Sequence, residues 1–267
     1  MPNHITNIIT APKHVIDALR GDEEQPVDFN KIIPMPAILN GITEDSYTPL
    51  AKFLAGALEP GADSGISAAI RSLEVDAAGH RLKESLPKNA DINQFVIDYT
   101  MSLLVGPDHG VAFLRKMLLD EGRMSEKSFE MLTRTMEAYD TCGAFTWFDW
   151  SIANWGTKWN AYDAVFGDSG ESVTFNTAWS TPMPVLQKLS EMYPDDDISV
   201  MYADEDIGSN QGHLKLHAGD VTERPIEDPI AFAFDVIGGD PEAFGYVKDP
   251  ETGKYVYAGE EEEADAQ

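Results

Sequence analysis

Apolar residues at alternate positions open the chain and return in its second half. His4–Thr10 alternates and is rich in β-branched residues, which predicts a strand. A hairpin is predicted from strands over 159–166 and 171–178, which a Gly-Asp-Ser-Gly turn joins. Two further strands are predicted over 198–203 and 213–217.

Apolar residues three and four positions apart predict helices elsewhere. Pro12 begins a short helix that ends at Gly21, and a second helix follows Thr181-Pro182 and ends before Pro194. The same period runs through 48–153 and predicts a helical block. Its helices are expected over 92–103, over 111–119 and from Ser125 onward.

Shorter signals fill the rest of the chain. Pro34 and Pro36 exclude a helix where they stand, and 27–35 is predicted to be extended. Asp228-Pro229 precedes a short helix, and a turn over 249–253 joins two short Tyr- and Val-rich strands.

This order of elements predicts an α+β protein. A ferredoxin-like (split βαβ) antiparallel sheet with a helical insertion subdomain accounts for it. The sheet domain is expected to be discontinuous, from 1–36 and 154–220, with the insertion over 45–153. A C-terminal extension over 221–258 and a disordered acidic tail over 259–267 complete the chain.

The charge of the chain narrows the possible functions. Nineteen basic residues against 46 acidic ones give a net charge of −27, and after Arg134 the chain has 27 acidic and 6 basic residues. Such a surface repels phosphate backbones and anionic membranes, so a conventional basic nucleic-acid site is not expected. The chain shows neither a secretory signal nor an apolar run long enough to span a membrane, which predicts a cytoplasmic protein in the host cytosol.

One short segment is unusually rich in aromatic and amide side chains. Its residues are predicted to form a structural signature, because each buried ring needs a packing partner and each buried amide a hydrogen bond. Two interpretations are open: either both indoles close the seam between the insertion and the sheet, or the aromatic rings stack nucleic-acid bases. The negative charge favours the first. The signature residues are Asn154, Trp155, Gly156, Lys158, Trp159, Asn160, Tyr162 and Asp163.

Four sequence runs together resemble a known family. NWGTKWNAYD, VTFNTAW, STPMPVLQKLSEMYP and FNKIIPMP are similar to the YubB-type ferredoxin-like domain family of phage- and plasmid-encoded proteins. The resemblance implies a mobile-element origin and supports the predicted topology. It implies no catalytic residue, and "ferredoxin-like" describes the fold alone, because a single cysteine cannot hold an iron–sulfur cluster.

The candidates for chemistry are few. His213 and His217 lie on one predicted strand near the carboxylates of the preceding turn, but about 13 Å separates residues four apart on a strand. One ion is therefore not expected to reach both, and consecutive carboxylates diverge in the same way. Cys142, the single cysteine, is expected to be a small core residue. No catalytic residue, metal or cofactor is predicted, and the protein is not expected to be an enzyme.

These observations predict a protein that binds a host protein without catalysis. One form of this hypothesis is inhibition of a CRISPR- or restriction-type host defence by a DNA mimic, with carboxylates in place of phosphates. The alternative is a nucleic-acid-binding module that uses the aromatic segment 154–163. The predicted partner-binding residues are Asp195, Asp196, Asp197, Asp204, Glu205, Asp206, Glu227 and Asp228. The sequence predicts no oligomeric state.

Overall fold

The computed structural model describes residues 3–43, 106–120, 122 and 124–258, together with the separate residues 48, 51, 54, 94, 95, 98, 99 and 102. The chain divides into two compact units. The first contains 1–34 and 151–267, and the second contains 35–150. Within the described ranges, every helix is too short or too polar to cross a lipid bilayer.

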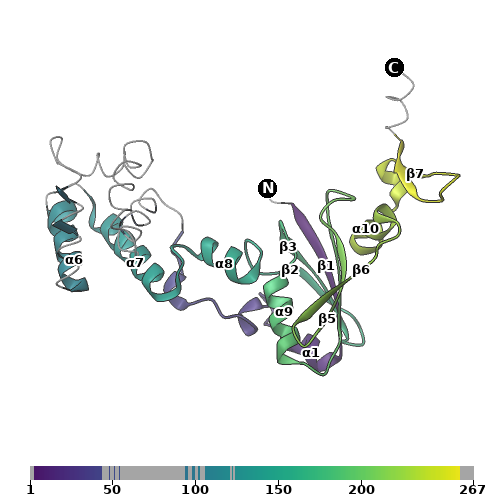
Figure 1. Ribbon diagram of the computed structural model, residues 1–267, viewed down its shortest axis with the longest axis horizontal. Helices are drawn as coiled ribbons and strands as arrows, with labels where there is room; N and C mark the ends of the chain where they lie inside the picture. Colours follow the sequence, from purple (N-terminus) through teal and green to yellow (C-terminus); the bar gives the residue numbers. More distant parts are fainter. Residues whose placement is uncertain are drawn as a thin grey trace, which may run out of the picture. The chain divides into compact units, whose positions relative to one another are not determined.

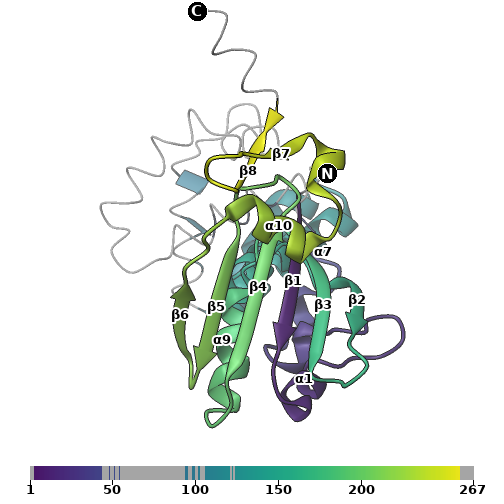
Figure 2. The same ribbon diagram turned by 90° about the vertical axis from the view of Figure 1, so that its right-hand side faces the viewer.

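A six-stranded antiparallel sheet forms the centre of the first unit. The strands lie in the order β2-β3-β1-β4-β5-β6, and Figure 2 shows them almost face-on. Every neighbouring pair in the sheet is antiparallel. The strands are β1 (His4–Thr10), β2 (Tyr162–Phe166), β3 (Ser172–Ala178), β4 (Ile198–Asp204), β5 (Gly212–His217) and β6 (Asp220–Arg224).

The alternation of buried and partly exposed residues in β1 shows which face of the sheet is covered. Ile5, Asn7 and Ile9 are fully buried, while the residues between them are partly exposed. Because successive side chains point to opposite faces, these three residues lie on one face together with Val173 and Phe175 of β3. The main core of the unit lies on this face.

Helices cover the two faces of the sheet unequally. The helix α1 (Lys13–Ala18) contacts β3, and α9 (Met183–Met192) contacts β5 and β6. The third helix, α10 (Pro229–Ile237), contacts β1 and β4 from the opposite side, as Figure 1 shows. Its Ala233 and Val236 pack against Ala203, so α10 covers only part of that face.

The C-terminal part of the unit is a small hairpin. The strands β7 (Tyr246–Lys248) and β8 (Tyr255–Tyr257) pair antiparallel after a short helical turn, η4 (Pro241–Phe244). The Asp228 carboxylate caps α10 by accepting hydrogen bonds from the amides of Ile230 and Ala231, and it also accepts one from the Tyr255 amide. The two oxygens of one half-buried carboxylate thus hold α10 and β8 together.

The described part of the second unit is helical. Its helices are α6 (Pro107–Leu114), the π-helical turn η3 (Arg115–Asp120), α7 (Glu126–Cys142) and the first half of α8 (Trp147–Trp155), together with η2 (Ala37–Leu39). Leu114, Leu118 and Leu132 are fully buried in one apolar cluster. The Ser125 hydroxyl caps α7 by accepting the Ser128 amide, at the residue where the sequence predicts a helix start.

The structure confirms the predicted α+β class and most of the predicted elements, corrects two of them and adds one strand. The stretch 27–35 is not extended throughout, because Phe29–Lys31 forms the helical turn η1, which the Asp28 side chain caps. The strand expected from 159 begins at Tyr162. The strand β6 was not predicted, because all five of its residues are exposed and no apolar alternation marks it. The expected helix over 92–103 and the tail 259–267 fall mostly or wholly outside the described residues.

Gly156 gives a stability prediction for the sheet unit. Its backbone has φ +77°, and a Cβ there would lie 2.7 Å from Pro184 Cδ. Gly156→Ala is expected to lower the free energy of unfolding by about 2–4 kcal/mol through strain and overpacking.

Gly170→Ala is the matched control for this measurement. It has φ +73°, but its added Cβ meets only the flexible Lys13 side chain. Urea unfolding is expected to show a loss of about 1 kcal/mol for this variant. Equal losses in the two variants would contradict the close approach at Pro184.

Candidate functional site

The aromatic segment lies at one end of the sheet, and its first indole is buried. Trp155 is 4% exposed, and its Nε1 donates a 2.9 Å hydrogen bond to the carbonyl of Ile33. Its ring meets Phe29 edge-on, with 5.8 Å between the ring centres. Both the apolar and the polar part of Trp155 are therefore satisfied inside the sheet unit.

Asn160 joins the same early segment to the aromatic run. Its Oδ1 accepts the amides of Phe29 and Ala161, at 2.9 and 3.0 Å, and its Nδ2 donates to Asp28 Oδ1 at 2.7 Å. These three bonds need an acceptor and a donor on one short side chain, which is what an asparagine amide provides. This accounts for the joint occurrence of the FNK and NWGTKWN runs in the sequence.

Buried hydroxyls hold the backbone between these two anchors. Thr157 Oγ1 donates to the Ala178 carbonyl at 2.8 Å and accepts the Ala178 amide at 3.2 Å. Ser151 Oγ donates to the Lys158 carbonyl at 2.6 Å, and Ser180 Oγ donates to the Gly156 carbonyl. Thr157 and Ser151 are fully buried, so solvent does not compete for these bonds.

The next indole of the segment is on the surface. Trp159 is 36% exposed, and Trp179, at the end of β3, is 43% exposed. The Lys158 ammonium lies 4.7 Å from the centre of the Trp159 ring and 4.8 Å from that of Trp179. We call Lys158, Trp159 and Trp179 the indole patch. The expectation that both indoles of the segment are buried at a seam is wrong for Trp159, because the Ser151 and Thr157 anchors fix the loop with this side chain outward.

Two exposed carboxylates lie beside the indole patch. The Trp179 amide donates to the Asn3 carbonyl on one side of β1, and the Glu205 amide donates to the His4 carbonyl on the other side. Because neighbouring strands are about 4.8 Å apart, the backbones of Trp179 and Glu205 are separated by roughly 10 Å. Glu205 and Asp206 are both exposed.

The Asp204 carboxylate fixes this arrangement. Asp204 is 5% exposed and accepts hydrogen bonds from Asn3 Nδ2, Asn210 Nδ2 and the Asp206 amide, at 3.2, 3.1 and 3.0 Å. Asn210 Nδ2 also donates to the Trp179 carbonyl at 3.0 Å. A single buried carboxylate therefore holds the acidic loop against the turn that carries Trp179.

The Tyr162 phenol occupies the same end of the sheet. Its hydroxyl lies 2.8 Å from His4 Nδ1 and donates to the Thr177 carbonyl at 3.3 Å. Burial raises the pKa of Tyr162, and the charges of Asp163 and Glu205 raise it further. The phenol therefore stays neutral at physiological pH, and its role here is to hold the strands together.

The structure divides the predicted partner-binding carboxylates. Asp196 accepts a hydrogen bond from His14 at 2.7 Å, and Asp197 pairs with Lys215 at 2.6 Å and with His217 at 3.0 Å. Asp204 and Asp228 hold internal hydrogen bonds. The exposed members of the set are Asp195, Asp197, Glu205, Asp206 and Glu227, and of these Asp197 is held by Lys215 and His217.

These carboxylates also do not form one continuous row. Asp197 precedes β4 and Glu205 follows it, and seven residues of strand span roughly 20 Å. Of the two groups, only the one after β4 lies beside the indole patch.

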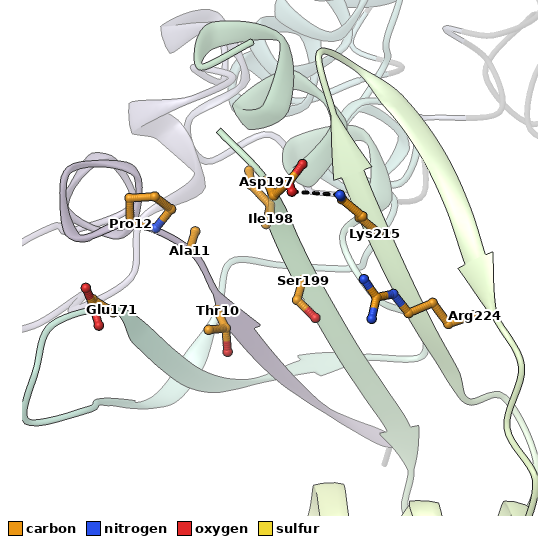
Figure 3. Close-up of a pocket in the computed structure, with 9 residues that line it drawn as sticks. All are labelled: Thr10, Ala11, Pro12, Glu171, Asp197, Ile198, Ser199, Lys215 and Arg224. Atoms are coloured by element: carbon orange, nitrogen blue, oxygen red, sulfur yellow. Dashed lines mark ion pairs between the residues drawn. The ribbon is translucent and has the colours of Figure 1, made fainter. Parts of the chain in front are cut away.

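An open hollow with both polar and apolar lining lies on the part of the sheet that α10 leaves open. It has a volume of about 400 Å³, and Figure 3 shows its lining residues. The Lys215 side chain points to Asp197, while the Arg224 guanidinium extends over the sheet toward Ser199. Ser199 Oγ is 3.4 Å from His213 Nε2, which is long for a hydrogen bond, and His213 stacks on Phe232 instead.

The predicted chemistry candidates remain separate. His217 pairs with Asp197, while His213 lies against α10. Among the residues that the structure describes, no three metal-ligating side chains come together. Cys142 Sγ donates to the Ala138 carbonyl inside α7.

The comparisons with known proteins concern the sheet unit. Residues 154–235 match the family described as the ferredoxin-like domain in Api92-like proteins. The match covers under a third of the chain, begins at the aromatic segment and ends within α10. Together with the antiparallel sheet, it makes the sheet unit a ferredoxin-like domain.

The other comparisons add little. No curated protein matches the sequence. Among solved structures, protein Api92 from Yersinia pseudotuberculosis matches at 12% identity and a TM-score of 0.30, over 85% of this chain and 99% of that one. A similarity this low carries no argument.

Sequence reasoning missed Trp179 and Asn210 as parts of the site. Trp179 ends a run that the sequence marks as a strand, and its φ of +72° turns it out of the sheet. The two hydrogen bonds between Thr157 Oγ1 and the Ala178 backbone bring it next to Lys158, and no spacing in the sequence signals that contact.

Asp204→Ala tests the supporting role of this buried carboxylate. Its loss leaves Asn3, Asn210 and the Asp206 amide without their acceptor, so the free energy of unfolding should fall by about 2 kcal/mol. Glu205→Ala, at the exposed neighbour, should change it by less than about 0.5 kcal/mol. Urea unfolding of both variants measures the difference, and similar values would contradict the assignment of Asp204 as structural.

Asp197 gives a pH prediction. The hydrogen bond from Lys215 holds the pKa of Asp197 below its usual value, with a smaller contribution from His217. Because the ammonium stabilises the ionised carboxylate, Lys215→Met should raise the pKa of Asp197 toward the usual value of an aspartate without such a partner. Carboxyl ¹³C NMR titration measures this, with Lys188→Met as a control that should leave Asp197 unchanged. An unchanged Asp197 in Lys215→Met would refute the pairing.

Proposed function

We propose that this protein is a non-catalytic binding protein that holds a basic surface of another protein. The contact is made by the indole patch with Glu205 and Asp206 beside it. The observation that carries the proposal is the exposure of two indoles on a backbone that buried hydrogen bonds make rigid. A rigid display of this kind limits the entropy lost on binding.

The chemistry of the patch suits a protein partner. Tryptophan is enriched among the residues that dominate binding energy, and truncating one such anchor costs about 2 kcal/mol or more. Carboxylates at the edge of such an anchor speed association with a basic partner and exclude acidic ones. The described ranges of the sheet unit contain 24 acidic and 9 basic residues, so the electrostatic preference for a basic partner extends over the whole unit.

The setting that we propose is a phage or plasmid protein acting on a host protein in the host cytosol. The sequence resemblance supports this setting, and inhibition of a host defence is the use that the charge suggests. Mimicry of DNA is a weaker form of the proposal. A phosphate-like row needs regularly spaced free carboxylates, whereas half of the predicted set is held in internal contacts.

Nucleic-acid binding is the second candidate. The exposed Trp159 and Trp179 rings with Lys158 between them are groups that stack bases and contact phosphate. The surrounding charge opposes this function, because single-strand binding uses a positive groove. A gel shift with single-stranded DNA and RNA that disappears in Trp159→Ala would favour it.

Site-specific crosslinking tests the proposed function. Trp159→p-benzoylphenylalanine, in bacterial cells that carry the gene, should give a discrete covalent adduct with a protein that has a basic surface. In a lysate irradiated at roughly 0.5 M salt the adduct should not form, because screening removes the charge contribution to the encounter before the covalent bond is made.

The same substitution at Met192 is the control. Met192 is 44% exposed at the end of α9, so its accessibility is similar while its surroundings differ. Identical adducts from both positions would contradict the proposed surface. So would an adduct from position 159 that persists unchanged when Glu205→Gln and Asp206→Asn are combined.

A further inference from the structure

Lys158 occupies a position in the indole patch that a ligand could take. Its ammonium is within 5 Å of the centres of two indole rings, both about two-fifths exposed. The face of an indole attracts cations, and the attraction to tryptophan is stronger than to the other aromatic side chains. Two such faces directed at one cation form a cation-binding arrangement, and this chain supplies its own cation.

The backbone of Lys158 is fixed, whereas its side chain is adaptable. Ser151 Oγ holds the Lys158 carbonyl, and the neighbouring Thr157 and Asn160 are anchored in the same way. The ammonium is a compact, strongly hydrated charge on a flexible stem, so it can move into solvent while the loop stays in place. A planar guanidinium is more weakly hydrated and stacks on aromatic faces, so it can replace the ammonium between the indoles.

We propose that Trp159 and Trp179 form a clamp for an arginine of the partner, and that Lys158 fills this clamp in the free protein. This inference rests on the proposed function and names the chemistry of the contact. Glu205 and Asp206, roughly 10 Å away on the other side of β1, receive the further positive charges of the same basic segment. Lys158 thereby selects against weakly bound cations, because a ligand must displace it.

The clamp is tested by whether one substitution strengthens or weakens the binding of an arginine peptide. Lys158→Met removes the competing cation and its repulsion while keeping the length of the side chain. With an end-blocked hexa-arginine peptide at about 0.15 M salt, this variant should bind about fivefold more tightly than the wild type. Lys188→Met makes the same charge change on α9, where Lys188 pairs with Glu191 at 2.9 Å, and should alter affinity by less than about twofold.

Removing an indole should act in the opposite direction. Trp159→Leu keeps an apolar side chain but loses the ring face, and should weaken hexa-arginine binding by about fivefold with unchanged thermal unfolding. Isothermal titration calorimetry measures the wild type, these three variants and the Glu205→Gln/Asp206→Asn double variant. The same set is then titrated with a 20-residue oligothymidylate, for which a phosphate contact predicts weaker binding by Lys158→Met.

The outcomes separate the two proposals. If Lys158→Met and Lys188→Met behave alike, while Glu205→Gln with Asp206→Asn weakens binding, the clamp is wrong and the proposed function stands. If hexa-arginine binds neither the wild type nor Lys158→Met, both proposals fail. If Lys158→Met, and not Lys188→Met, binds hexa-arginine more tightly than the wild type, the clamp is supported. If Lys158→Met instead binds oligothymidylate more weakly and gains no affinity for hexa-arginine, the clamp is overturned in favour of nucleic-acid binding.

Discussion

The hydrogen bonds of Asn160 and Trp155 are the constraint on which the sheet end depends. Asn160 holds Asp28 and Phe29, and the Trp155 indole holds Ile33, so two segments more than 120 residues apart in sequence become one structure. Because Trp155 and Phe29 are buried, water has little access to the bond between Trp155 and Ile33 or to the bond between the Phe29 amide and Asn160. Lys158 and Trp159, the members of the indole patch on the loop after α8, take their position from these hydrogen bonds.

Buried polar groups extend that constraint across the sheet. Asn7 is fully buried and donates to Phe175, Thr177 and Ile5, while Thr181 donates to Asn7. Such a network specifies one arrangement of strands, because each partner left unsatisfied would cost free energy. The same end of the sheet thus combines a rigid interior with exposed indoles and carboxylates, which are the properties that a preformed binding surface requires.

The sequence predicts the fold well where one face of an element is buried. β1 and β3 each bury one face, which gives the alternation of apolar residues, and α7 buries one face, which gives the 3.6-residue period. β6 buries no face, so it carries no such pattern and was missed. The aromatic segment was recognised as a structural signature, but its two indoles were treated alike. Their different exposure depends on where Ser151 and Thr157 hold the backbone, and such tertiary hydrogen bonds leave no periodic pattern. For the same reason Asp204 and Asp228 read as surface charges, although they are internal acceptors.

The central claim is that one short segment buries the indole of Trp155 and exposes that of Trp159. Fluorine NMR of the protein with 5-fluorotryptophan tests this most directly, with each of the five resonances assigned by a Trp→Phe substitution. On transfer from H₂O to D₂O, the resonances of Trp159 and Trp179 should shift, while that of Trp155 should stay constant. A solvent-insensitive Trp159, or a Trp155 that shifts as much as Trp159, would contradict the account.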